Sequence, residues 1–249
     1  MKLNKLIAIA TISLLSGGIS MAQKALNLED IVAGNVIQTK GIGSMTWLKD
    51  GERYSRLENN KQTGGTDIVA YQVKDNSREV IIPSSLLTDK STGKPITARS
   101  ISWSADNEKV LIYNNTQRVW RYDTRGDYWV LNLKDGALRQ LGKGMPESSM
   151  MFAKFSPDGT RVAYVSNNNI YVEDIDSGKI TQLTKDGSDT IVNGTFDWVY
   201  EEEFSCRDGF RWSPDGKHIA YLQSDTKGTG MFDIINNVDS IYAKVIHFP

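Results

Sequence analysis

The sequence predicts an all-β protein, a partial β-propeller of about four four-stranded blades. A motif that joins an aromatic residue to a tight turn recurs four times, and a second turn between two apolar runs follows three of the copies. Helical periodicity is almost absent from the chain. Units of about 50 residues with four short strands each are the sequence signature of propeller blades. A non-repeating β-sandwich is the alternative fold.

The first hairpin of each unit is marked by an aromatic residue and a Ser-Pro-Asp-Gly-like turn. The four copies are Thr46–Gly51, Ser102–Asn107, Lys154–Gly159 and Arg211–Gly216. Their aromatic residues stand 52 to 57 residues apart. Pro, Asp and Gly favour tight turns, and an alternating strand follows, as in Arg161–Val165 and His218–Leu222. Each copy therefore predicts a β-hairpin.

A second hairpin follows in three of the units. The paired runs are Ile68–Val73 with Val80–Ile82, Tyr128–Leu133 with Leu138–Leu141, and Ile170–Ile175 with Ile180–Leu183. Two hairpins make one four-stranded blade. The fourth unit has only its first hairpin before a tail that ends at Pro249. We therefore expect part of a larger ring, with unpaired strand edges that favour aggregation or dimerisation.

The first 22 residues have the pattern of a secretory signal peptide. Lys2 and Lys5 form a basic start, Leu6–Leu15 is apolar, and Ser20–Ala22 provides small residues for cleavage. We expect residues 1–22 to be removed and 23–249 to form the propeller region. The protein would then be exported across the inner membrane to the periplasm or cell surface. An uncleaved membrane anchor is the alternative.

Composition excludes several classes of function. The 29 basic and 30 acidic residues nearly cancel and form no long block of one sign, which argues against nucleic-acid binding. Cys206 is the single cysteine, so we expect no internal disulfide bond. The only histidines, His218 and His247, have no recognised metal-ligand spacing and suggest no nucleophile–base pair with Cys206. We expect no metal and no cofactor.

One segment, Ile191–Ser205, fits neither hairpin of the repeat and is predicted to contain a short helix beginning near Asp197. It carries three consecutive glutamates, Glu201 to Glu203. A run of carboxylates is commonly a solvated charged face. The alternative is a cation site, because adjacent helical residues point about 100° apart and two of the three can converge.

Aromatic residues flank the three glutamates. Trp198, Tyr200 and Phe204 are expected to limit the exposure of the bound cation to water. Like charges held close raise one another's pKa, and a bound ammonium group relieves their repulsion. The segment therefore suits the α-ammonium group of a peptide.

The segment Asp197–Glu203, followed by Arg211–Gly216, resembles the double-glutamate region of the dipeptidyl peptidase IV family. In that family the last two glutamates of the run hold the free N-terminus of the substrate peptide. The resemblance implies this role for Glu202 and Glu203, with Glu201 as a neighbour.

A second stretch, Val119–Tyr122, resembles the family segment whose arginine contacts a backbone carbonyl of the substrate. This implies that role for Arg121. Arg118 and Arg125 are close enough in sequence to compete for it, and an exposed loop arginine without a site is the other interpretation.

The resemblance also implies properties of the full-length protein. Family members join an eight-bladed propeller to a C-terminal α/β-hydrolase domain with a Gly-x-Ser-x-Gly nucleophile, and they release X-Pro or X-Ala dipeptides from free peptide N-termini. The 249 residues contain no Gly-x-Ser-x-Gly, so we expect no catalytic residue here and no activity from this chain alone. A homodimer of the full-length serine peptidase is implied as well. The alternatives are a non-catalytic secreted propeller that binds a partner, and a prolyl tripeptidyl peptidase.

Overall fold

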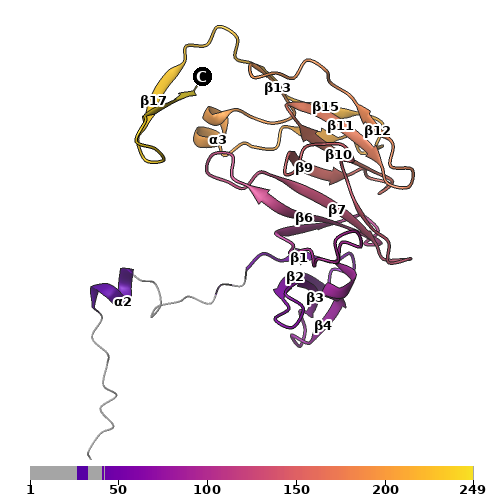
Figure 1. Ribbon diagram of the computed structural model, residues 1–249. Helices are drawn as coiled ribbons and strands as arrows, with labels where there is room; N and C mark the ends of the chain where they lie inside the picture. The colour runs from indigo at the N-terminus through magenta and orange to yellow at the C-terminus, as the bar shows by residue number, and fades with distance from the viewer. Residues whose placement is uncertain (1–26, 33–40, 42, 249) are drawn as a thin grey trace, which may run out of the picture. The chain divides into compact units, whose positions relative to one another are not determined.

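A computed structural model describes residues 27–32, 41 and 43–248 of the chain (Figure 1). The chain divides into two compact units, Met1–Ile42 and Gly43–Pro249. The described part of the first unit contains one short helix, α2 (Leu28–Val32). The predicted signal peptide, residues 1–22, lies outside the described residues. Within the described ranges, no helix has the length and apolar character that crossing a bilayer requires.

The second unit confirms the predicted propeller blades. Three consecutive antiparallel groups of four strands follow one another, coloured from purple to orange in Figure 1. The first comprises β1 (Thr46–Trp47), β2 (Arg53–Asn59), β3 (Thr66–Gln72) and β4 (Arg78–Ile82); the second β5 (Ser100–Trp103), β6 (Lys109–Gln117), β7 (Arg125–Asn132) and β8 (Leu138–Gln140); the third β9 (Met150–Phe155), β10 (Arg161–Ser166), β11 (Asn169–Asp174) and β12 (Ile180–Gln182). A 3₁₀ helix, η1 (Ser84–Leu86), follows the first blade.

The fourth unit departs from the simple repeat. Its first hairpin, β14 (Phe210–Trp212) with β15 (Ile219–Tyr221), forms as expected. The next strand, β16 (Gln223–Asp225), pairs with β13 (Ile191–Asn193), which precedes the hairpin. The segment that the repeat leaves as a tail contains a further hairpin. Its strands are β17 (Phe232–Asn236) and β18 (Lys244–Phe248).

Strands in the middle of each blade are buried on both faces, which explains their continuous apolar runs. On β6, Ile112 packs into the core between blades 1 and 2, whereas its neighbours Leu111 and Tyr113 pack into the core between blades 2 and 3. On β10, Tyr164 faces blade 2, and Val165 packs with Phe210 of the fourth unit. Alternation along a strand thus distributes side chains between two separate cores.

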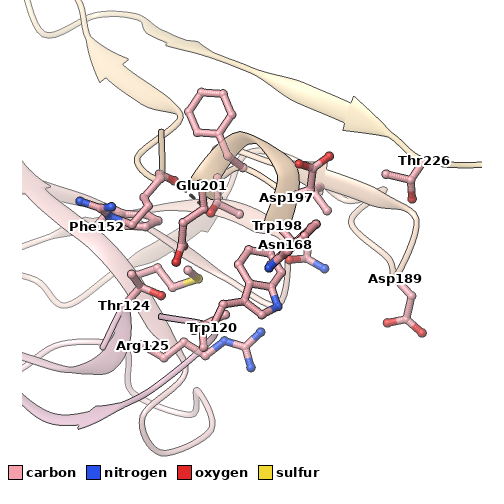
Figure 2. A pocket seen from close by; sticks show the side chains of 16 residues that line it. Trp120, Thr124, Arg125, Phe152, Asn168, Asp189, Asp197, Trp198, Glu201 and Thr226 are labelled. Carbon is pink, nitrogen blue, oxygen red and sulfur yellow. Dashed lines mark hydrogen bonds between the residues drawn. The ribbon is translucent and has the colours of Figure 1, made fainter. Parts of the chain in front are cut away.

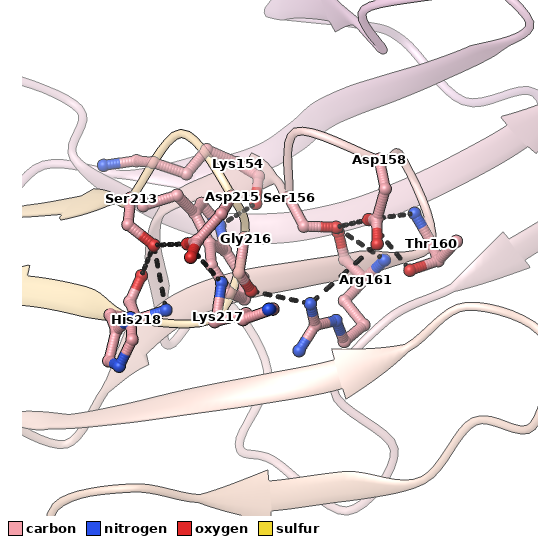
Figure 3. A network of polar contacts seen from close by, with 11 residues as sticks. Lys154, Ser156, Asp158, Thr160, Arg161, Ser213, Asp215, Gly216, Lys217 and His218 are labelled. Carbon is pink, nitrogen blue, oxygen red and sulfur yellow. Dashed lines mark hydrogen bonds and ion pairs between the residues drawn. The ribbon is translucent and has the colours of Figure 1, made fainter.

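The Ser-Pro-Asp-Gly turns are held by a repeated hydrogen-bond network (Figure 3). In the third copy, Ser156 Oγ donates to Asp158 Oδ1 at 2.5 Å and accepts from the Arg161 N–H at 3.0 Å. The Ser156 hydroxyl and the Thr160 backbone N–H stabilise the ionised carboxylate, which lowers the pKa of Asp158 to about 2. Serine and aspartate make the same contact in the second and fourth copies.

Neighbouring blades are joined by side chains of the repeated motif. The Trp103 indole N–H donates to Ser55 Oγ of blade 1 at 3.0 Å, and Trp212 donates to the Lys154 carbonyl of blade 3 at 3.3 Å. Arg161 of blade 3 donates to the Gly216 carbonyl in the turn of the fourth unit at 2.7 Å. In the second and fourth copies, the aromatic residue that identifies the repeat therefore also connects it to the preceding blade.

The two-sided packing predicts a stability difference between two aliphatic residues. Ile112→Ala is expected to lower the free energy of unfolding by about 2–5 kcal/mol, because Ile112 is fully buried and a cavity would remain. Val80→Ala on the exposed face of β4 should change it by less than about 0.5 kcal/mol. Urea unfolding of both variants measures the difference. Equal losses would contradict the assignment of Ile112 to a core between blades.

The turn network predicts a shifted titration. In Ser156→Ala the pKa of Asp158 should rise towards its ordinary value of 3.8, because the main hydrogen bond to the carboxylate is lost. In the wild type, the contribution of Asp158 to the free energy of unfolding is complete above pH 3.8 and is lost as the pH falls through about 2. The free energy of unfolding of Ser156→Ala should therefore depend less on pH in this acid range. Carbon-13 NMR titration of the aspartates measures the pKa. Thr160→Val, which keeps the Thr160 N–H, should give a smaller rise, and an unchanged pKa in Ser156→Ala would refute the account.

Candidate functional site

The segment between β13 and β14, residues 194–209, carries the three glutamates and is called the acidic insertion. It projects from the fourth unit. Its two ends are joined by an antiparallel bridge between Thr195 and Asp208 and by a hydrogen bond from the Gly209 N–H to the Gly194 carbonyl at 3.1 Å. A Cβ atom at Gly209 would lie 3.0 Å from the Gly194 carbonyl carbon, so the close approach of the two chains favours glycine. The insertion is therefore a closed loop on a fixed base.

A lysine of blade 3 holds this base. Lys154 Nζ lies 2.5 Å from Asp208 Oδ1, donates to the Phe210 carbonyl at 2.9 Å, and sits 3.6 Å from the centroid of the Phe210 ring. Burial disfavours the charged amine and lowers the pKa of Lys154 to about 8, although Asp208 opposes the shift. Blade 3 and the insertion are thereby connected by a partly buried ion pair.

The predicted helix is present as α3 (Trp198–Phe204). Asp197 caps it by accepting a hydrogen bond from the Tyr200 N–H at 3.0 Å. Ser205 ends it in the left-handed conformation, with φ of 53°. The helix start near Asp197 is confirmed, and the helix carries all three glutamates.

The three glutamates occupy different environments on α3. Glu201 is 5% exposed, the Glu202 side chain is 10% exposed, and Glu203 lies on the exposed face. Because successive residues turn by about 100° around a helix, a short run of identical residues samples the buried and exposed sides. The Glu203 side chain makes no hydrogen bond or ion pair with any other residue that the structure describes.

Arg121 meets the helix although it is 81 positions away in sequence. Its Nε lies 2.5 Å from Glu202 Oε1, and its backbone N–H donates to Glu201 Oε1 at 3.4 Å. The competing arginines point elsewhere. Arg118 donates to the Trp120 carbonyl at 2.8 Å. Arg125 lines a hollow that contains neither Arg121 nor Glu202. The structure therefore brings Arg121 and Glu202 together and leaves Glu203 at the solvent side.

Two hollows share the residues Val119, Trp120 and Trp198. The larger, about 520 Å³, contains Arg121 and Glu202 and is also lined by Ile246 and His247 of β18. The smaller, about 220 Å³, contains Glu201 among aromatic side chains such as Trp120 and polar ones such as Arg125 and Asn168 (Figure 2). Consecutive glutamates of α3 thus line two different hollows.

Two of the aromatic residues that were expected to limit the exposure of a bound cation to water are themselves exposed. Trp198 lines both hollows, but Tyr200 and Phe204 are 39% and 65% exposed. Phe196 and Tyr200 instead stack with ring centroids 5.2 Å apart, and Phe204 contacts Tyr200 in a tilted arrangement at 5.6 Å. Their spacing of four residues places the three rings on one side of the segment, and of these rings only Phe196 also lines the hollow that contains Glu201.

The remaining reactive side chains lie apart from one another. His218 is exposed, and His247 Nδ1 lies 2.6 Å from Asp233 Oδ1 in the β17–β18 hairpin, where both side chains are exposed. Cys206 is a half-buried free cysteine. Within residues 27–32, 41 and 43–248, no group of three histidine, cysteine or acidic side chains could hold a metal ion.

The site contains residues that the sequence reasoning did not assign. Glu201 contacts the Arg121 backbone, and the Arg207 guanidinium lies 4.0 Å from the centroid of the Tyr122 ring. Trp120, which lines both hollows, could have been assigned from the sequence because it is the neighbour of Arg121 in the chain. No sequence pattern indicated Arg207 or the strand β18.

The fold and the site define a class: a β-propeller segment in which an acidic helical insertion meets an arginine loop of an earlier blade. Residues 104–249 match the family model described as the dipeptidyl peptidase IV (DPP IV) N-terminal region. This chain belongs to the dipeptidyl peptidase IV family, and it corresponds to part of the family's N-terminal region.

Individual relatives agree with this assignment. A probable dipeptidyl-aminopeptidase B of Chaetomium globosum is 36% identical over 138 residues, which cover 55% of this chain and 15% of the relative. A protein with the same description from Talaromyces stipitatus is 30% identical over 220 residues, or 85% of this chain and 24% of the relative. The aligned part of the chain thus spans less than a quarter of the length of these relatives.

A solved structure supports the fold. The crystal structure of Porphyromonas gingivalis dipeptidyl peptidase 4 superposes with a TM-score of 0.77 at 24% identity, covering 91% of this chain and 31% of that chain. At this level of identity the likeness concerns the fold.

The partly buried Lys154 predicts a pH dependence of stability. Its folded-state pKa of about 8 lies below the value of 10.5 for a free lysine, so the unfolded chain binds the extra proton between these limits. Folding stability should therefore rise with pH through this window. In Lys154→Met the rise between pH 7.5 and 9.5 should be smaller than in the wild type, as measured by urea unfolding. Lys90→Met, at an exposed position, should retain it, and parallel wild-type and Lys154→Met curves would contradict the prediction.

Proposed function

We propose that this chain is the substrate-docking portion of a dipeptidyl peptidase IV-like serine exopeptidase that releases X-Pro or X-Ala dipeptides. The observation that carries the proposal is the Arg121–Glu202 ion pair with the exposed Glu203 one residue further along α3. Glu202 and Glu203 bind the α-ammonium group of the peptide, and Arg121 binds a backbone carbonyl. The nucleophilic serine belongs to a hydrolase domain of the full-length protein.

The carboxylates have the capacity that this role requires. One Glu202 oxygen accepts from Arg121, which leaves the other available, and Glu203 is free of ion pairs with the described residues. At about 4 Å and an effective dielectric constant near 20, each ammonium–carboxylate contact is worth about 4 kcal/mol before desolvation. Two such contacts favour a free N-terminus over an acylated one.

Arg121 is arranged to serve both the protein and the substrate. Its Nε faces Glu202, yet its side chain is 68% exposed. A guanidinium group has five N–H donors in a fixed plane, so the pair with Glu202 leaves others for a peptide carbonyl. The ion pair thereby fixes the orientation of the donors before substrate binds.

This arrangement explains why the product would be a dipeptide. A fixed α-ammonium group places only one peptide bond within reach of a nucleophile at a set distance. The acidic helix therefore acts through substrate position and takes no part in bond breaking. Blocking the N-terminus removes the main point of attachment.

We also propose that the protein is exported to the periplasm or the cell surface. The basic start and apolar run of residues 1–22 support this. N-terminal sequencing of the mature protein should begin at Gln23, and a retained Met1 would count against export with cleavage.

The docking role is tested by substituting the glutamates in the full-length protein. Glu202→Ala and Glu203→Ala should each lower kcat/KM for Ala-Pro-p-nitroanilide by about 30-fold or more, which corresponds to about 2 kcal/mol for losing one member of a desolvated charge pair. The N-acetylated substrate should be poor for every variant and should change little. Glu79→Gln, an exposed carboxylate on β4, is the control.

Unchanged kcat/KM in both glutamate variants would overturn the docking role. The products from a defined peptide with Pro at its second position decide the exopeptidase type by mass. A dipeptide supports the proposal, whereas a tripeptide identifies a prolyl tripeptidyl peptidase.

A further inference from the structure

We infer that Glu201 is a positioning residue that fixes the backbone of the Arg121 loop, residues 118–124, against α3. The inference rests on the proposed function of Arg121 and Glu202, and it assigns a separate task to the first glutamate of the run. Glu201 acts through Arg121 and makes no contact with the substrate.

The burial of Glu201 distinguishes it from its neighbours. A side chain that is 5% exposed and carries a carboxylate requires partners, because burying an unpaired charge is costly. Among the described residues the hydrogen-bond partner of this carboxylate is the backbone N–H of Arg121, at 3.4 Å. The contact spans 80 positions of sequence and joins the insertion to blade 2.

The backbone ladder of its own sheet does not extend into the Arg121 loop, although the Tyr113 hydroxyl of β6 donates to the Asp123 carbonyl at 2.8 Å. Strands β6 and β7 end their pairing at Gln117 and Arg125, and the loop lies between these residues. Within it, the Val119 and Thr124 N–H groups both donate to the Tyr122 carbonyl. The Arg121 N–H takes no part in these bonds within the loop and donates to Glu201 instead.

Three contacts from the acidic insertion, two from α3 and one from Arg207, therefore hold one short loop. Glu201 accepts from the main chain of Arg121, Glu202 pairs with its side chain, and Arg207 stacks on the ring of Tyr122. Because Glu201 and Glu202 are adjacent on the helix, fixing the backbone by one places the guanidinium group opposite the other. Preorganised donors bind better because less conformational freedom is lost on binding.

The chemistry of this contact separates positioning from a charge effect. A backbone N–H needs an acceptor oxygen, and the amide oxygen of glutamine can supply one at nearly the same place. A direct electrostatic role toward the substrate ammonium would instead require the negative charge. Glutamine and alanine at position 201 therefore give different results under the two accounts.

The test compares Glu201→Ala with Glu201→Gln in the full-length enzyme. Glu201→Ala should raise KM for Ala-Pro-p-nitroanilide by about tenfold with a smaller change in kcat, from the usual effect of removing a hydrogen bond to a charged group. Glu201→Gln should restore most of the lost kcat/KM. The N-acetylated substrate keeps the backbone carbonyl that Arg121 binds, so Glu201→Ala should lower its turnover as well, whereas a direct contact of Glu201 with the ammonium group would leave that turnover unchanged.

A double-mutant cycle keeps the test valid if Glu201→Ala also lowers stability. In an Arg121→Ala background, Glu201→Ala should have little further effect on KM, because the residue that it positions is absent. Thermal unfolding of each variant reports folding separately. A full additional loss in this background would overturn the positioning role.

The outcomes also separate this inference from the proposed function. Equal losses in Glu201→Gln and Glu201→Ala would show that the charge is used and would refute positioning through the N–H group. Normal KM in Glu201→Ala together with a large loss in Glu202→Ala would refute the inference alone. Normal activity in Glu202→Ala and Glu203→Ala would refute the docking function itself.

Discussion

The two-sided burial of the middle strands is the constraint on which the rest of the structure depends. Neighbouring residues of β6 and β10 enter different cores, so blades 2 and 3 each pack against a neighbouring unit on both faces. The same constraint fixes the direction of each blade relative to the next. A loop of blade 2 and an insertion of the fourth unit can therefore meet, although 80 residues separate Arg121 from Glu201.

Polar contacts then fix the ends of the blades. Beyond the visible turn motif, each of the three complete blades has an acidic or amide side chain near the start of its third strand. Asp67 and Asp127 accept backbone N–H bonds from Ser84 and Ser148 at 2.7 Å and 2.8 Å, and Asn169 accepts from Gly187 at 3.0 Å. These side chains tie each blade to the linker that leads to the next. This repeat escaped the sequence reasoning because its partners lie in linkers of different length.

The acidic insertion is held at its base by several contacts, and its three glutamates lie in different environments. The Thr195–Asp208 bridge and Lys154 hold the base, and the short helix above it presents its three glutamates in three environments. A longer helix would not be needed, since one turn is enough to separate a buried carboxylate from an exposed one. The chain thereby uses three identical residues for an internal contact, an ion pair and a solvent-facing charge.

The sequence by itself determined the blades, their hairpins and the capped start of α3, because strand alternation, turn chemistry and helix capping are local. It also pointed to Glu202, Glu203 and Arg121 through resemblance. Only the tertiary structure decided that Glu201 contacts the Arg121 backbone, that Tyr200 and Phe204 face solvent, and that residues 232–248 form a hairpin beside the site. These features depend on contacts between segments far apart in the chain, and no local pattern encodes which face of a short helix meets a distant loop.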